Sequence, residues 1–399
     1  RNEISLHFKI QKGTEMPSDL SLWDKRFLLL NMAFFLVFLN IAFYYLYPVV
    51  LHSMGGESHV IGWVMGLFSI AAVSSRPFMG KMAARKGEYR IILAGIGVIL
   101  FASLGYYHIQ RIGSFMFLIR IVHGLGFSAF IAGSFSLATR SFPPARRGEA
   151  FGIVGASLMG AIAMGPLIGE YLIRKYGFNA LYTAASGAIV LALIVISMTS
   201  FSSHPVYIEE KKETKYIPLL RNWSFVFLLG STLIFAHCQS TVFNFLALIA
   251  DQKGTGSGHF FFTSLLLAIL ILLTMGKMID RYGKLILLRL FYPSLSLGIL
   301  LIPILLQSWR FFFPALLYGT GIGFLYPVHN ALAASHGTEK EKTVVMSIFT
   351  TVYDTGFITG AVISGWISGW TGLDILFYLM GLLGFMGFTI AIFAPIKEE

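Results

Sequence analysis

Long uninterrupted apolar runs are the feature that most constrains what this chain can fold into. Of its 399 residues, 56% are hydrophobic and 12% are charged, roughly half the charged fraction of an ordinary soluble protein. A helix needs about 20 apolar residues to cross a bilayer. Twelve runs meet that need: Phe27–Val50, His59–Met82, Arg90–Ile109, Phe115–Thr139, Glu149–Arg174, Ala180–Phe201, Asn222–Ala250, Gly258–Asp280, Leu285–Leu306, Trp309–Ala334, Lys342–Trp370 and Asp374–Pro395. We therefore predict an all-α membrane protein with twelve transmembrane helices.

The positive charge of the chain is distributed unevenly between its loops. The formal net charge is +11. The even-numbered connections, with the helix ends beside them, hold 17 Lys and Arg residues, whereas the odd-numbered connections hold 5. Because loops rich in Lys and Arg stay in the cytoplasm, we expect both termini to be cytoplasmic. We also expect the protein to lie in a bacterial inner (plasma) membrane, in contact with its lipids. The excess charge is then a topology signal that requires no nucleic-acid partner.

A short basic loop occurs twice, once in each half of the chain. Gly80–Gly87 and Gly276–Gly283 share five of eight residues at an offset of 196. The two halves also correspond farther on, where His123–Gly126 aligns with Tyr318–Gly321 at an offset of 195. Such a repeat is typical of transporters whose ligand site lies between two matching halves near the bilayer midplane.

The polar segments divide the chain into five parts. We predict a cytoplasmic tail at 1–26, a six-helix bundle at 27–201, a cytoplasmic linker at 202–221, a second six-helix bundle at 222–395 and a short cytoplasmic tail at 396–399. This arrangement leaves almost no residues for a soluble domain.

The loop repeat carries a resemblance to a known family. Gly276–Lys284 is similar to the loop motif G-x-x-x-D-R-x-G-K/R of the major facilitator superfamily, although Ala84 replaces the Asp of that motif in the first copy. The resemblance covers essentially the whole chain and implies two pseudo-symmetric six-helix bundles that alternate between two open states, with a monomer as the usual form. It also implies a conformational latch at the residues that the two copies share with the motif: Gly80, Arg85, Gly87, Gly276, Asp280, Arg281 and Gly283.

Two further motifs resemble those of the twelve-helix efflux branches, which include drug–proton antiporters, arabinose-efflux-type permeases and staphylopine-type exporters. Arg120-x-x-x-Gly124-x-Gly126 matches the motif R-x-x-x-G-x-G in the fourth run. The fifth run resembles the antiporter motif G-x-x-x-G-P-x-x-G-G, with its small residues at Gly160, Gly165, Pro166 and Gly169. Within the family this pattern goes with export, whereas tight helix packing alone would also explain it.

Ionisable residues at membrane depth are candidates for function, because each costs several kcal/mol unless it is paired or hydrated. We expect Arg120 to face a cavity, where it binds an anionic group or communicates with a proton-carrying carboxylate; helix-to-helix pairing is the alternative. His123 is suited to titrate near neutral pH. Asp354 is the leading candidate for proton coupling, against a role as the fixed partner of a cation. Arg76 is expected to extend to the cytoplasm, and Glu170 to lie at the opposite interface.

Polar and aromatic side chains indicate the lining of the cavity, because the first, fourth, seventh and tenth helices usually line it in this family. The predicted lining residues are Asn40, Tyr44, His237, Gln239, Asn244, Tyr326, His329 and Asn330. Such a cavity suits a mid-sized polar-aromatic or zwitterionic metabolite.

These observations predict a secondary transporter, most consistent with proton-coupled export of a small organic solute. A proton-independent facilitator or importer is the first alternative, and a transport-inactive receptor or scaffold with the same fold is the second. The sequence has no G-x-x-x-x-G-K-[ST] phosphate loop, no nucleophile–base set typical of an enzyme and no metal-ligand spacing. We therefore expect no enzymatic activity, no cofactor and no metal.

Overall fold

The predicted helices are present in the structure. The computed structural model describes residues 24–141, 146–199, 219, 221–274, 278, 281–338 and 341–396. Within these ranges, eleven helical segments are long and apolar enough to cross a membrane. A twelfth apolar helix, Gly258–Thr274, has 17 residues and ends beside residues outside the described ranges. The prediction of an all-α protein with twelve apolar helices is therefore confirmed.

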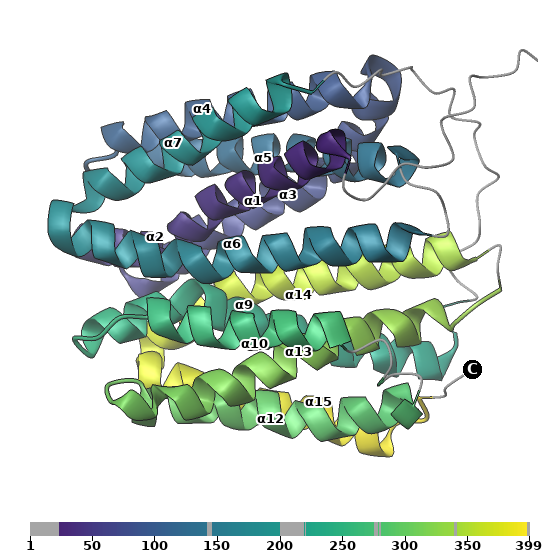
Figure 1. Cartoon of the computed structure of the whole chain (residues 1–399). Helices are drawn as coiled ribbons and strands as arrows, with labels where there is room; N and C mark the ends of the chain where they lie inside the picture. Colours follow the sequence, from purple (N-terminus) through teal and green to yellow (C-terminus); the bar gives the residue numbers. More distant parts are fainter. Residues whose placement is uncertain are drawn as a thin grey trace, which may run out of the picture.

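The two halves of the chain occupy the two halves of the molecule (Figure 1). The helices of the first half are α1 Lys25–Phe43, η1 Tyr44–Leu46, α2 Tyr47–Ser53, α3 Ser58–Lys86, α4 Glu88–Gly105, η2 Tyr106–His108, α5 Ser114–Ser141, α6 Arg147–Tyr176 and α7 Phe178–Ser197. The helices of the second half are α9 Trp223–Gln252, α10 Gly258–Thr274, α12 Lys284–Leu305, η4 Trp309–Phe311, α13 Phe312–Ala334, α14 Lys342–Thr371 and α15 Leu373–Phe393.

The sequence repeat corresponds to a structural repeat. Gly87 precedes α4 with φ 93° and Gly283 precedes α12 with φ 80°, a left-handed conformation that glycine adopts without steric cost. Close helix contacts repeat in the same way. A side chain on Gly124 in α5 would meet the carbonyl of Phe68 in α3, and one on Gly319 in α13 would meet the carbonyl of Ser264 in α10. Small residues at matching positions therefore let matching helix pairs approach closely.

The halves meet mainly along two seams, one between α3 and α14 and one between α6 and α10, with smaller contacts of α2 and η1 against α9. Both seams are tight where α3 and α10 begin. A Cβ added to Gly62 would lie 2.8 Å from the Cα of Gly365, and one added to Gly258 would lie 2.6 Å from the Cα of Leu167. We call this end of the molecule the closed end. The opposite end, which carries the loop at Gly87, is called the basic end.

The glycines of the fifth apolar run differ in how closely they pack. Gly165 of α6 faces α1, where an added Cβ would meet the side chain of Ala42 and lie 3.0 Å from its backbone carbonyl carbon. An added Cβ on Gly169 would lie 2.6 Å from Leu46 Cδ1. Gly160 has more space, because the nearest atom to its Cβ position is in Phe35 at 3.9 Å. Pro166 lies inside the same helix.

This difference gives a matched pair of variants. Gly165→Ala forces the backbones of α6 and α1 apart, and overpacking of this kind typically costs about 1–3 kcal/mol. Gly160→Ala places its methyl group at an ordinary contact distance, so we expect little change. Thermal unfolding of the purified proteins, followed by tryptophan fluorescence, should show a lower melting temperature for Gly165→Ala alone. Equal melting temperatures for the two variants would contradict the packing role of Gly165.

Candidate functional site

A cavity of about 740 Å³ lies between the two halves. It is lined by α1, α3, α5 and α6 of the first half and by α9, α10, α13 and α14 of the second. Its lining extends to Gly148 in the first turn of α6 and to Leu272 and Asn330 near the last described turns of α10 and α13. Those turns belong to the basic end, whereas both seams are tight at the closed end. The cavity is therefore directed towards the basic end.

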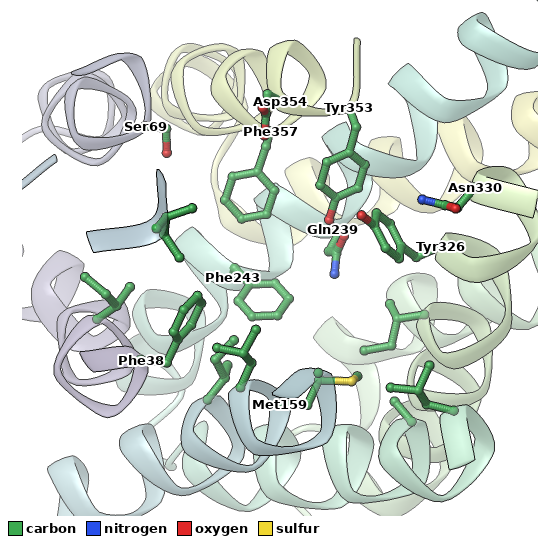
Figure 2. A pocket seen from close by; sticks show the side chains of 18 of the residues that line it. Phe38, Ser69, Met159, Gln239, Phe243, Tyr326, Asn330, Tyr353, Asp354 and Phe357 are labelled. Carbon is green, nitrogen blue, oxygen red and sulfur yellow. Dashed lines mark hydrogen bonds between the residues drawn. The ribbon is translucent and has the colours of Figure 1, made fainter. Parts of the chain in front are cut away.

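Aromatic rings form much of the cavity wall, and polar groups gather on one side of it. Six phenylalanines line the cavity: Phe38, Phe68, Phe127, Phe151, Phe243 and Phe357. Figure 2 shows Gln239, Tyr326, Asn330 and Tyr353 of the second half grouped together, across the cavity from Phe38. Such a site can hold a flat apolar body on one side and hydrogen-bond its polar edge on the other.

The polar side of the cavity is ordered by contacts between its own residues. The hydroxyl of Tyr353 donates to Gln239 Oε1 at 2.6 Å, which joins α14 to α9. The rings of Tyr326 and Tyr353 meet edge to face with centroids 5.0 Å apart. Tyr326 is 38% exposed. These contacts fix the direction of the hydrogen-bonding groups before a solute enters.

An ion pair spans the two halves at the cavity wall. Arg76 Nη1 of α3 lies 2.6 Å from Asp354 Oδ2 of α14, and the two side chains are 40% and 18% exposed. The expectation that Arg76 extends to the cytoplasm is therefore wrong, because the carboxylate of Asp354 holds its guanidinium in the cavity wall. The sequence left open that Asp354 is the partner of a cation, and in the structure Arg76 is that cation.

Three of the predicted lining residues do line this cavity, namely Gln239, Tyr326 and Asn330, and so does Asp354, the candidate for proton coupling. Arg120 and His123 do not line the main cavity directly. Together with Tyr44 and Asn244 they line an adjoining pocket of about 30 Å³, so a solute-binding role for Arg120 stays a prediction. Arg120 is only 2% exposed.

The prediction that Asn40 lines the cavity is also wrong, because its side chain lies in the interior of the first half. Its Nδ2 donates to Ser103 Oγ and to the carbonyl of Ala185, each at 2.9 Å. Its Oδ1 lies 3.0 Å from His123 Nε2. The Nδ1 atom of His123 lies 3.3 Å from the hydroxyl of Tyr106. Asn40 and His123 thus belong to a buried hydrogen-bond network that joins α1, α4, η2, α5 and α7.

The two histidines predicted in the second half are likewise interior residues. His329 is fully buried, with Nδ1 2.7 Å from the carbonyl of Leu325 and Nε2 2.9 Å from Ser231 Oγ. His237 Nδ1 lies 3.3 Å from Thr359 Oγ1. Neither lines the cavity, so their prediction as lining residues is wrong. Among the residues that the structure describes, no three His, Cys, Asp or Glu side chains come together to hold a metal ion.

A carboxylate joins the two halves at the closed end. Glu170 of α6 accepts from the backbone N–H and the hydroxyl of Ser257, both at 2.6 Å, and from the N–H of Gly258 at 3.1 Å. These donors lie where α10 begins, so a negative charge there is also favoured by the helix dipole. The expectation that Glu170 is simply interfacial missed this contact, which we call the Glu170 clasp.

The predicted latch is described only in part. Gly276 and Asp280 lie outside the described residues. Gly80 lies within α3, Arg85 is exposed near its end, and Gly87 and Gly283 form the turns described above. The Arg281 guanidinium lies over the ring of Tyr282 at 5.3 Å. The latch function therefore stays a prediction.

Sequence reasoning missed three contributors to the site: Arg76 as a cavity residue, Tyr353 as the partner of Gln239, and the phenylalanine wall. Arg76 carried a usable signal, because a helical cation and a helical carboxylate at membrane depth are expected to pair. The phenylalanines carried none. The chain has 37 of them, and nothing in their spacing separates those that face a cavity from those that face lipid.

Comparison with known proteins identifies the family. A family model of the Major Facilitator Superfamily matches residues 29–354 and 258–399. The chain belongs to this superfamily. Among solved structures, this facilitator resembles a mutant form of the nucleoside transporter NupG, with a TM-score of 0.76, 14% identity and coverage of 92% of this chain and 99% of that one. At that identity the likeness establishes the fold alone.

Relatives with curated names are also transporters. The facilitator is 21% identical to the riboflavin transporter RibZ of Clostridioides difficile (strain 630), over 73% of this chain and 63% of the relative. It is 28% identical to the probable multidrug resistance protein EmrY of Escherichia coli (strain K12), over 37% of this chain and 29% of the relative. The chain thus spans less than two thirds of the length of either relative. The chain is therefore a member of a superfamily of membrane transporters, with apolar helices long enough to cross a bilayer.

Proposed function

We propose that this facilitator exports a small organic solute in exchange for protons across a bacterial inner membrane, with its basic end and both termini in the cytoplasm. The observation that carries the proposal is the Arg76–Asp354 ion pair, which joins the halves where a solute must bind. A carboxylate that pairs with a cation in one state, and takes up a proton when that cation withdraws, couples proton binding to the movement of the halves.

The conformation supports a specific order of events. With the cavity directed towards the basic end and Asp354 paired with Arg76, the carboxylate is ionised and the site is free to accept a solute from the cytoplasm. Rocking of the halves would break the pair, expose Asp354 to the other side and let it take a proton as the solute leaves. Return of the protonated form would deliver the proton to the cytoplasm, where Arg76 pairs with Asp354 again.

Three further observations support the proposed direction of transport and the proposed orientation of the protein in the membrane. The Lys and Arg residues concentrate in the loops of the basic end, as expected for cytoplasmic loops. The glycine-rich α6 resembles the motif that goes with export in this family. EmrY, one of the relatives, is named as a probable multidrug resistance protein. The proposal also includes a monomer, since one chain supplies both halves of the cavity.

Flux under an imposed pH gradient tests the proposal. Purified protein is reconstituted in liposomes with an acidic lumen, and uptake of a panel of aromatic metabolites and dyes is measured. One-for-one exchange of an uncharged solute for protons should accumulate that solute inside by about tenfold for each unit of pH difference. Collapse of the gradient with nigericin should release the accumulated solute, and protein-free liposomes serve as the blank.

Other outcomes would contradict the proposal in distinguishable ways. Uptake that stops at equal solute concentrations on both sides would indicate passive transport that is independent of protons. Accumulation that requires the opposite gradient would indicate a proton-coupled importer. A solute that binds the purified protein and never crosses the bilayer would indicate a receptor or scaffold with this fold.

A further inference from the structure

The pocket of about 30 Å³ lies directly beside the main cavity. Five residues line both spaces: Ile41, Tyr45, Phe68, Ser69 and Phe357. This volume exceeds the space that one ordered water molecule needs and suits a group the size of a carboxylate. The pocket is therefore an extension of the cavity that can hold one small polar group, and we call it the side pocket.

Arg120 brings a full positive charge to the side pocket, and its hydrogen-bond partners leave that charge uncompensated. Its Nε donates to the carbonyl of Val64 at 3.0 Å, Nη1 to the hydroxyl of Tyr106 at 3.3 Å and Nη2 to Met65 Sδ at 3.3 Å. All three acceptors are neutral. A guanidinium has five N–H donors, so two remain after these bonds.

No carboxylate pairs with Arg120 anywhere in the part of the chain that the structure describes. The rings of Phe68 and Tyr47 lie 5.2 and 5.7 Å from its guanidinium carbon, and such contacts offset only part of the cost of burying the charge. Arg76 differs, because Asp354 already balances it. Arg120 is thus a buried cation beside a space that an anionic group could fill.

We propose that the side pocket binds the anionic group of the transported solute, and that the substrate class is the aromatic organic acids. In this arrangement the ring system packs against the phenylalanines of the main cavity. The acid group passes Phe68 and Ser69 and accepts the two remaining N–H bonds of Arg120. The inference rests on the proposed transport function, since it assigns the solute a pose in the cavity, but it does not depend on proton coupling.

Matched ligands test the inference on the purified protein in detergent at a fixed pH. Isothermal titration calorimetry compares naphthylacetate with naphthylacetamide, which has the same ring and no charge. We expect naphthylacetate to bind at least about tenfold more tightly, because hydrogen bonds to an ionised group are about twice as strong as neutral ones. In Arg120→Gln the two affinities should become equal. Arg120→Lys should keep part of the preference, because it retains the charge and loses the fork geometry.

Each other outcome decides against the inference. Equal affinities in the unmodified protein would overturn it, and that comparison stands even if Arg120→Gln does not fold. A preference that survives in Arg120→Gln or Arg120→Lys unchanged would place the acid elsewhere. Sodium chloride could raise the melting temperature of the unmodified protein but not that of Arg120→Gln, while naphthylacetate binds no more tightly than naphthylacetamide. In that case the pocket binds an inorganic anion and is not a solute subsite. None of these results bears on proton exchange, which the liposome flux assay measures separately.

Discussion

Asp354→Asn is expected to abolish proton-coupled transport while the protein still folds and still reaches the membrane. The substitution keeps the shape of the side chain but removes the charge that faces Arg76 at 2.6 Å. The variant lacks the carboxylate proposed to carry the proton and leaves the Arg76 guanidinium without this partner in the cavity wall. We expect gradient-driven flux to fall by at least about 100-fold, which corresponds to about 3 kcal/mol. The liposome assay with an acidic lumen measures it.

The double variant Arg76→Gln with Asp354→Asn is the informative control. It removes both charges, so no unpaired cation remains between α3 and α14. We expect this variant to exchange labelled for unlabelled solute at equal pH and to ignore a pH gradient. Full gradient-driven uptake by Asp354→Asn would exclude the carboxylate as the proton carrier and restrict the ion pair to a structural role.

Glu170→Ala is expected to favour a second conformation of the protein, in which the two halves separate at the end of the molecule that we call the closed end. The clasp consists of three hydrogen bonds to one carboxylate, and bonds to charged groups contribute about 1.5–3 kcal/mol each. Loss of even one such contribution changes the ratio of the two states by at least about tenfold. Spin labels at Tyr171 and His259, both exposed near the clasp, should show a longer distance population in the variant.

The chain offers a clean background for this measurement. Its single cysteine, Cys238, is fully buried and is replaced by serine before labelling. Glu57→Ala is the matched control, because Glu57 is a 78% exposed carboxylate at the same end whose ion-pair partner is His59 in its own half. An unchanged distance distribution in Glu170→Ala, or an equal shift in Glu57→Ala, would contradict the clasp.

Much of the fold was predictable because a bilayer leaves few choices. Backbone polar groups must be satisfied within each spanning segment, so long apolar runs become helices. The repeated loop then showed which residues of the two halves correspond. Gly87 and Gly283 both adopt a positive φ before a helix, which glycine does without steric cost. The residue boundaries assigned to the five parts of the chain stay a prediction.

The candidate site was less predictable, because helical position does not say which face of a helix meets the cavity. Asn40 and Gln239 looked alike in the sequence, as polar residues within apolar runs. Asn40 satisfies its hydrogen bonds inside one half, whereas Gln239 faces the space between halves. Pairings between distant helices, such as Arg76 with Asp354, depend on how the two halves dock, and single-chain periodicity carries no information about docking.

The two seams of the closed end occupy equivalent places in the repeat, since Gly62 corresponds to Gly258 and Gly365 to Glu170 at offsets of 196 and 195. One seam is held by backbone contact between glycines and the other by a carboxylate. Glycine contacts separate without breaking a hydrogen bond, whereas the Glu170 clasp must exchange its donors for water. At the closed end we therefore expect the α3–α14 side to part before the α6–α10 side. In the proposed transport cycle, the helices would then turn about a line near Glu170, and the solute would leave off-centre, against α3 and α14.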